Sequence, residues 1–302
     1  MKNKNRTLIA GIALIAVLAG CSHQKNVSEA YGNFETVTLL VSAQGSGQLE
    51  WFHVEEGKNL SGNDTVGLID TTALALQKKT LLARMSVIRA KGSGLAAKKE
   101  VIKRQLMNAR VEQKRIQGLF EGHAATQQQL DNVNGKVDVL KYQIRELDVQ
   151  RQSVLREMDV IRSQIAAVED RIDKCFILSP ADGVVLEKYA EAGELVQPGK
   201  TLFKMGDMTY MYLRVYVDET LLPEIRTDGE AEILIDRPGG LMDTLSGTVS
   251  WISDEAEFTP KIIQTRKERV NLVYAVKIRV KNDGSLKIGM PGEANFRKRQ
   301  QQ

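Results

Sequence analysis

The chain has 302 residues, with 42 Lys and Arg against 38 Asp and Glu, and a formal net charge of +4 at pH 7. This near balance excludes a dedicated nucleic-acid binder, which would carry a concentrated basic face. The hydrophobic share of 42% and the charged share of 26% exclude a fully disordered chain and a membrane protein with many spans. All six prolines lie at or after Pro180, so a long helix before that residue meets no proline.

The N-terminal segment 1–20 is typical of a secretory signal peptide. Three basic residues precede an apolar run from Thr7 to Ala19, which is too short to span a bilayer stably. The run ends in Leu-Ala-Gly-Cys, which resembles the bacterial lipobox and implies cleavage before Cys21 and a covalent diacylglyceryl lipid on it. We therefore expect a signal peptide over 1–20 and a lipidated tether over 21–36. The alternative is an ordinary signal peptide with an incidental cysteine.

Lipidation would decide the compartment and the state of the cysteines. The protein would fold outside the cytoplasm, anchored to the cell envelope by lipid rather than by a helix. Because Cys21 would carry the lipid, Cys175 would be left alone, and we expect no intrachain disulfide. Apart from the lipid we expect no cofactor and no metal.

Segments 47–70 and 183–206 form an internal repeat with a constant offset along the chain. Two pairs of glycines coincide, Gly47 with Gly183 and Gly57 with Gly193. Four apolar pairs also match: Leu49 with Val185, Leu60 with Val196, Val66 with Leu202, and Ile69 with Met205. The pattern resembles the two halves of a biotinyl/lipoyl-type β-sandwich, each too small to bury its own apolar face. We expect these halves over 37–70 and 175–206, folded against one another.

The segment between the two copies carries a heptad pattern, which predicts a coiled coil. Apolar residues alternate at spacings of three and four over residues 130–172, where only Arg151 interrupts them, and recur every seven residues over 74–116. Gly92 and Gly94 predict a softer first helix, because each costs about 1 kcal/mol relative to Ala.

The helical pattern breaks at residues 121–126, near the midpoint of the insertion over 71–174. Thr126 followed by Gln129 predicts a capping box that opens the second helix. Two helices of about 48 residues would form an antiparallel hairpin roughly 70 Å long, with its tip at about 119–126.

The charges of the two helices differ. Residues 71–121 carry twelve Lys and Arg against three acids, whereas 127–174 carry eight against nine. We expect most of these residues to face solvent. The alternative for the basic helix is a shared acidic partner surface, or the acidic helix of a neighbouring subunit.

Residues 207–302 predict a β-domain of about six strands, either a small barrel or a sandwich. The clearest strands cover 211–217, 232–235, 248–252 and 272–280, with a short helix at 219–225 and a loop over 258–270. The predicted fold class is therefore α+β and elongated. A coiled-coil helical hairpin is inserted in a split lipoyl-like sandwich, and a β-barrel domain follows.

The order of these parts resembles the HlyD-type periplasmic adaptors, also called membrane fusion proteins, over nearly the whole mature chain. The block 258–277 and the segment 287–292 are similar to YbhG-like adaptors, which serve ABC exporters. The resemblance implies a periplasmic adaptor that links an inner-membrane exporter, with the ABC type favoured, to a TolC-type outer-membrane channel. It also implies a homo-oligomer in the form of a hexameric ring. The alternative is an adaptor for an RND or MFS pump. The RND type is disfavoured, because few residues outside the sandwich and barrel are available for the extra domain that RND adaptors carry.

The hairpin tip resembles the tips of adaptors that dock onto TolC-type channels. Those tips carry Arg, then Leu four residues on, then Ser seven residues later. Arg115, Leu119 and Thr126 have this spacing, with Thr in place of Ser. The resemblance implies that these three residues contact the channel. The alternative is that Leu119 is hairpin core, Thr126 is only a helix cap and Arg115 is a solvated residue.

The residue after the lipidated cysteine departs from a family pattern. Family members that stay at the inner membrane often have Asp there, whereas this chain has Ser22. The inner membrane is favoured as the site of the anchor, and the outer membrane stays open.

Three other function classes fit the sequence less well. A biotin or lipoyl carrier would present a lysine on the turn between the half-sandwiches, where this chain has its insertion. We do not expect an enzyme, because the three histidines, His23, His53 and His123, are scattered and the acidic run at 254–257 is typical of a solvated surface. A purely structural coiled-coil envelope lipoprotein would have no use for the sandwich and the barrel.

Overall fold

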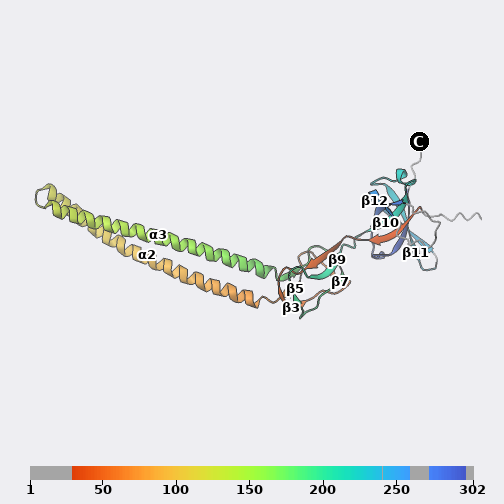
Figure 1. Cartoon of the computed structure of the whole chain (residues 1–302), viewed down its shortest axis with the longest axis horizontal. Helices are drawn as coiled ribbons and strands as arrows, with labels where there is room; N and C mark the ends of the chain where they lie inside the picture. The colour runs from red at the N-terminus through yellow and green to blue at the C-terminus, as the bar shows by residue number, and fades with distance from the viewer. Residues whose placement is uncertain (1–28, 240, 259–271, 297–302) are drawn as a thin grey trace, which may run out of the picture. The chain divides into compact units, whose positions relative to one another are not determined.

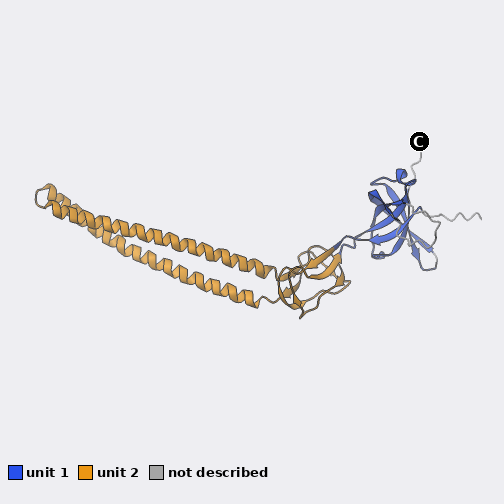
Figure 2. Cartoon of the chain, viewed as in Figure 1, with its two compact units in different colours: residues 1–38, 206–302 blue, residues 39–205 orange. Residues whose placement is uncertain are grey.

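The computed structural model describes residues 29–239, 241–258 and 272–296 (Figure 1). The chain divides into two compact units, one made of residues 1–38 with 206–302 and the other of residues 39–205 (Figure 2). The expected signal peptide, Cys21 and nearly all of the expected loop over 258–270 lie outside the described residues.

The first unit is a closed six-stranded barrel in which every neighbouring pair of strands is antiparallel. Around the barrel the strands are β1 (Ala30–Glu35), β10 (Tyr210–Asp218), β13 (Leu272–Lys281), β12 (Leu241–Phe258), β11 (Glu230–Arg237) and β14 (Pro291–Phe296). The expected helix at 219–225 is shorter than predicted, because only the 3-10 turn η1 (Leu222–Glu224) forms there.

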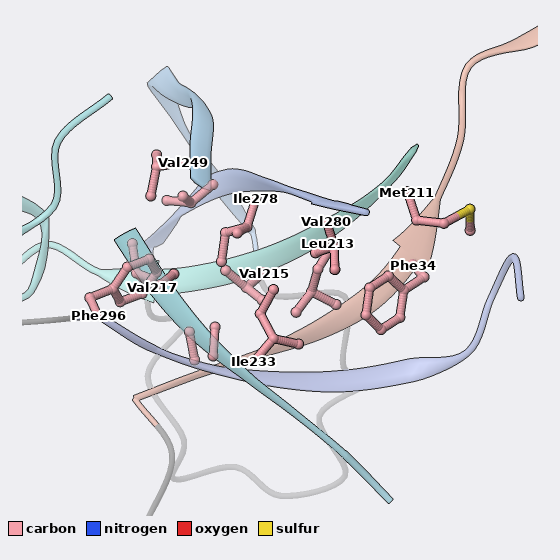
Figure 3. Packing of buried hydrophobic residues seen from close by; sticks show 14 of the residues in the cluster. Phe34, Met211, Leu213, Val215, Val217, Ile233, Val249, Ile278, Val280 and Phe296 are labelled. Carbon is pink, nitrogen blue, oxygen red and sulfur yellow. The ribbon is translucent and has the colours of Figure 1, made fainter. Parts of the chain in front are cut away.

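Along each strand, side chains alternate between the inside and the outside of the barrel, and the inward side chains fill the interior. In β10, Leu213 and Val215 are fully buried, and in β11 Ile233 is fully buried. Figure 3 shows Phe34 of β1 turned into the same interior as Leu213 and Ile233. The alternation of apolar and polar residues that predicted these strands therefore matches the alternation of buried and exposed side chains.

One expected boundary is wrong, because residues 30–35 are not part of a tether. They form β1, which pairs with β10 on one side and β14 on the other. Ala30 and Phe34 are each 1% exposed, so the strand contributes to the core. At Gly32 an added Cβ would lie 1.8 Å from the carbonyl oxygen of Arg214, so only glycine allows this close approach to β10. Residues 207–302 alone therefore do not close the barrel.

The second unit contains a β-sandwich of two four-stranded sheets. One sheet has the order β2 (Thr38–Ser42), β9 (Thr201–Gly206), β7 (Gly183–Lys188) and β4 (Asn59–Leu60). The other has the order β6 (Phe176–Leu178), β5 (Thr65–Ile69), β3 (Gly47–Phe52) and β8 (Leu195–Val196). Each sheet takes two strands from the segment before the insertion and two from the segment after it, so neither segment has a sheet of its own.

The internal repeat of the sequence is a pseudo-twofold relation between the two segments. The N–H of Gly57 donates to the carbonyl of Val185 at 2.8 Å, and the equivalent N–H of Gly193 donates to the carbonyl of Leu49 at 2.7 Å. Both glycines have positive φ, +83° and +92°. All eight residues of the four apolar pairs are buried, with exposed fractions of 0–7%. The repeat in the sequence therefore reflects a shared core.

The insertion forms two long helices that lie side by side, α2 (Thr72–Glu121) and α3 (Gln127–Asp173) (Figure 1). Every apolar residue of the predicted heptad pattern is buried or half-buried, and Arg151, the predicted interruption, is exposed. Leu74 packs against both the sandwich core and the hairpin core, which joins the base of the hairpin to the sandwich. The predicted hairpin is confirmed.

The polar residues that interrupt the heptads of α2 bind polar residues of α3. Lys99 Nζ donates to Asp148 Oδ1 at 2.5 Å, and Gln113 Nε2 donates to Asn134 Oδ1 at 2.7 Å. The bond from Lys99 lowers the pKa of the Asp148 carboxyl. Such pairs in an apolar seam specify which residues of the two helices lie opposite each other.

Gly92 provides a test of the packing of α2. An added Cβ would meet Val154 Cγ1 at 3.4 Å, which is an ordinary contact. We expect Gly92→Ala to raise the unfolding free energy of the hairpin by about 1 kcal/mol, because Ala has the higher helix propensity. Urea unfolding followed by circular dichroism at 222 nm measures it. Gly135→Ala in α3, where an added Cβ meets nothing within 4 Å, is the control for propensity alone; a loss of stability at Gly92 only would contradict the packing.

The Lys99–Asp148 pair predicts a pH dependence. Because the folded-state pKa of Asp148 is lowered, its stabilisation is present above the ordinary carboxyl pKa and is lost as the pH falls through the lowered value. We expect Lys99→Met to be less stable than the parent chain at pH 7 and to show a smaller loss of stability below pH ~4. Unfolding midpoints of the two chains across pH 2–7 measure the difference. Parallel pH profiles would contradict the pair.

Candidate functional site

The tip of the hairpin is a five-residue turn, residues 122–126, between the end of α2 and the start of α3. The N–H of Ala124 donates to the carbonyl of Leu119 at 2.7 Å, and the N–H of His123 donates to the carbonyl of Phe120 at 3.0 Å. These two bonds make a Schellman motif, which satisfies carbonyls at the end of α2. The left-handed residue of the motif is His123, with φ +61°, rather than the glycine before it.

The start of α3 has the predicted capping box. Thr126 Oγ1 accepts the N–H of Gln129 at 3.2 Å, and the N–H of Thr126 donates to Gln129 Oε1 at 2.8 Å. The two bonds satisfy two backbone donors reciprocally. The cap uses the hydroxyl oxygen of Thr126 as an acceptor and leaves its hydrogen for another partner. Together with the Schellman motif, the box fixes the path of the turn.

Arg115 lies two turns before the end of α2 and is held by Glu112. Its Nε donates to Glu112 Oε2 at 3.0 Å and its Nη2 to Oε1 at 2.5 Å. The pair lowers the pKa of the Glu112 carboxyl and raises that of the guanidinium. Two of the five N–H donors of Arg115 are used, and its side chain is exposed, so three donors face solvent. Glu112 thus orients the guanidinium in this structure through an exposed ion pair.

Leu119 lies four residues after Arg115 and therefore on the same face of α2. Its exposed fraction is 40%, and it does not belong to the apolar clusters of the hairpin. The half-buried Phe120 takes the core position next to it. The structure thus places an oriented arginine and an exposed leucine together, with Thr126 across the turn at the start of the other helix.

Sequence reasoning missed two features of the tip. In the sequence, the only sign of a partner for Arg115 is the acidic residue Glu112 three positions earlier, and this spacing is common on any charged helix. The left-handed residue was not signalled, because histidine is an unusual choice there and a glycine stands next to it. Both features orient the candidate residues rather than add a new one.

The other candidate groups of the chain have structural contacts. The ring of His53 stacks on Trp51 with centroids 5.0 Å apart. Cys175 is buried, its Sγ donates to the carbonyl of Arg171 at 3.3 Å, and burial raises the pKa of the thiol. Glu257 of the acidic run accepts Arg214 Nη2 at 2.7 and 2.9 Å. Within the described ranges, no three His, Cys, Asp or Glu side chains are grouped so that they could hold a metal ion.

In the part of the chain that the structure describes, none of the helices has an apolar stretch long enough to cross a bilayer.

Two solved structures share this arrangement of parts. MacA from Actinobacillus actinomycetemcomitans superposes with a TM-score of 0.66 at 17% identity, over 89% of this chain and 78% of that one. The membrane fusion protein Spr0693 from Streptococcus pneumoniae gives 0.52 at 13% identity, over 89% and 98% of the two chains. The fold is that of a membrane fusion adaptor. The predicted fold class is therefore confirmed.

Curated relatives match over nearly their whole length. A UPF0194 membrane protein of Citrobacter koseri is 26% identical over 98% of both chains. The UPF0194 membrane protein YbhG of Salmonella agona is 26% identical over 95% of this chain and 96% of its own. No family model matches the chain. The resemblance to YbhG-like membrane fusion adaptors is confirmed by these relatives together with the fold.

The capping box predicts the effect of substitutions at Thr126. We expect Thr126→Ala to lower the unfolding free energy of the hairpin by about 1 kcal/mol, because the N–H of Gln129 loses its acceptor Oγ1. Thr126→Ser keeps the oxygen and should remain within about 0.5 kcal/mol of the parent chain. Thermal unfolding followed by circular dichroism measures both. Equal stability of the Ala and Ser variants would contradict a structural role for the box.

Proposed function

We propose that this protein is the periplasmic adaptor of a tripartite export system. It would link an inner-membrane exporter to a TolC-type outer-membrane channel. The observation that carries the proposal is the long hairpin inserted between two halves of one sandwich, with an oriented arginine and an exposed leucine at its tip. The fold of MacA and the full-length match to YbhG support it.

The membrane end of the adaptor would be set by Cys21. In the proposed mature protein this residue carries the lipid, and β1 begins nine residues later at Ala30. A fully extended chain spans at most ~3.6 Å per residue, so the barrel would begin within about 32 Å of the anchor. The barrel is therefore the part of the protein that would meet the exporter at the membrane. We favour the inner membrane for the anchor.

The channel end of the adaptor would be the tip of the hairpin. Helices of 50 and 47 residues give a rod of roughly 70–75 Å, which is long enough to cover much of the distance between two membranes. At its tip, three donors of Arg115 would bind backbone carbonyls of the channel, and Leu119 would fill an apolar slot. The hydroxyl of Thr126 would donate a further bond while its oxygen maintains the cap.

The energy for transport would come from the exporter, and an ABC transporter is the favoured partner. The sequence contains no glycine-rich phosphate-binding loop, and the relatives with the YbhG name match along the whole chain. An adaptor for an RND or MFS pump is the alternative. The adaptor would act as a homo-oligomeric ring, hexameric in the family it resembles, with no chemistry of its own.

A photo-cross-linking experiment in intact cells tests the docking proposal. A photoreactive amino acid at Leu119 is expected to form a covalent product with an outer-membrane channel protein. The control is Met107 in the same helix, which is also exposed but lies twelve residues, about 18 Å, from Leu119. We expect little or no channel product from the Met107 probe. Equal channel products from both positions, or none from Leu119, would contradict docking through the tip.

A substitution sharpens the same experiment. With the probe moved to Gly118, Leu119→Asp is expected to reduce the channel product about tenfold or more, because a carboxylate would have to leave water on docking. Met107→Asp is the matched control and should leave the yield unchanged. Since both side chains are exposed, neither substitution should unfold the hairpin, which circular dichroism checks.

A further inference from the structure

The outer face of the barrel has a groove of about 470 Å³ that crosses β1, β14 and β11. This volume lies within the range of ~300–1,000 Å³ that is typical of small-molecule sites. Most of its lining is apolar or aromatic, as such sites require. We call it the tyrosine groove; the side chains that provide its apolar and aromatic lining are Tyr31, Tyr216, Leu234, Met242, Val273 and Pro291.

Two glycines explain why the outside of the barrel is hollow at this point. Gly32 and Gly292 lie opposite each other on β1 and β14, and the backbone of both lines the groove. An added Cβ at Gly292 would lie 2.9 Å from Phe34 Cε2 and 3.0 Å from Leu213 Cδ1, two side chains of the core (Figure 3). At Gly32 the obstacle is the carbonyl oxygen of Arg214, as described above. The two strands therefore lie closer to the interior than residues with a side chain would allow, and the groove lies on their outer side.

The groove has two tyrosine rings. Tyr31 and Tyr216 lie opposite each other on β1 and β10; the first is 54% exposed and the second is half-buried. The face of an aromatic ring attracts a cation within about 6 Å of its centroid. The barrel already contains one such contact, because the guanidinium carbon of Arg214 lies 5.8 Å from the centroid of the Tyr216 ring. Glu257 neutralises this guanidinium, and the ring of Tyr31 is the one exposed to a ligand.

The charge of the groove is negative. Its ionisable residues are Asp236 on β11 and Glu293 on β14, and none of the described residues that line it is basic. Glu293 has an interaction of its own. Asp236 is exposed, and within the described residues its carboxylate forms no ion pair and no hydrogen bond. The next residue along the strand, Arg237, is held by Asp243 instead. The carboxylate of Asp236 is therefore available to a cationic ligand.

We propose that the tyrosine groove binds an organic cation, a positively charged centre attached to an apolar or aromatic body. The body would contact Leu234 and Met242, and the charged centre would lie between the ring of Tyr31 and the carboxylate of Asp236. Because β1 and β11 flank β14, these two side chains start about 10 Å apart, and one cation between them can contact both.

The site goes beyond the proposed function, and neither depends on the other. All the lining residues belong to the unit made of residues 1–38 and 206–302, whereas the hairpin tip belongs to the other unit. The barrel would therefore have a small-molecule ligand of its own, separate from any contact between Leu119 and a channel.

Calorimetric titration of the full chain with tetraphenylphosphonium tests the proposal. Tetraphenylborate is the matched control, because it has nearly the same size and shape but the opposite charge. We expect the dissociation constant of the phosphonium to be at least tenfold lower than that of the borate. The formal net charge of the sequence is +4, so the overall charge of the chain would favour the anion and cannot produce this preference. Equal constants for the two ions, or no binding of the phosphonium, would overturn the proposal.

Substitutions in the groove locate the site. We expect Asp236→Asn and Tyr31→Leu each to raise the dissociation constant of the phosphonium at least threefold, and Tyr31→Phe, which keeps the ring, to leave it unchanged. The controls are Asp254→Asn and Tyr210→Leu, which change an exposed carboxylate and an exposed ring on the same barrel outside the groove. All these side chains are exposed, so the variants should fold, which circular dichroism checks.

The two sets of variants give different results only if the groove is the site. Equal losses of affinity in the control and groove variants, or no loss in either, would show that the phosphonium binds elsewhere and would contradict the proposal. If the phosphonium does not bind while the Leu119 probe still reaches the channel, the docking function stands and only the groove is wrong.

Discussion

The antiparallel pairing of β5 with β6 is the constraint on which the rest of the second unit depends. β5 leads into α2 and β6 follows α3, so their pairing holds the two ends of a hairpin of about a hundred residues side by side. The N–H of Ile69 donates to the carbonyl of Cys175 at 2.9 Å, directly at this junction. The free energy for closing so long a loop comes from the sandwich core, because neither half has a sheet without the other. The helices then need arms of nearly equal length, and their 50 and 47 residues satisfy this need.

Much of this architecture was predictable from the sequence because it repeats. The constant offset between the half-sandwiches, the heptads and the break between them are regular signals, and each corresponds to a face that must be buried. Thr126 and Gln129 predicted their capping box for a related reason, since the motif is local. Structures that depend on regular or short-range spacing were therefore accessible to sequence analysis.

The features that the sequence did not reveal depend on distant partners. β1 has only two inward apolar residues, and its neighbours β10 and β14 lie about 180 and 260 residues further along the chain. Lys99 and Gln113 interrupt the heptads of one helix, and only the structure shows that they bind Asp148 and Asn134 of the other. At the tip, Arg115, Leu119 and Thr126 had the expected spacing, but the orientation of Arg115 comes from Glu112 and the path of the turn from His123.

The position of β1 gives the first unit a mechanical property. Only two residues separate the end of β1 at Glu35 from the start of β2 at Thr38, so the chain passes almost directly from barrel to sandwich. Tension applied at the N-terminus would run along β1, parallel to its axis. That tension would pass through the covalent backbone of β1 into β2, and the backbone bonds of β1 to β10 and β14 would keep the barrel closed around the strand. β1 is thus both a strand of the barrel and the covalent path from the N-terminus to the sandwich.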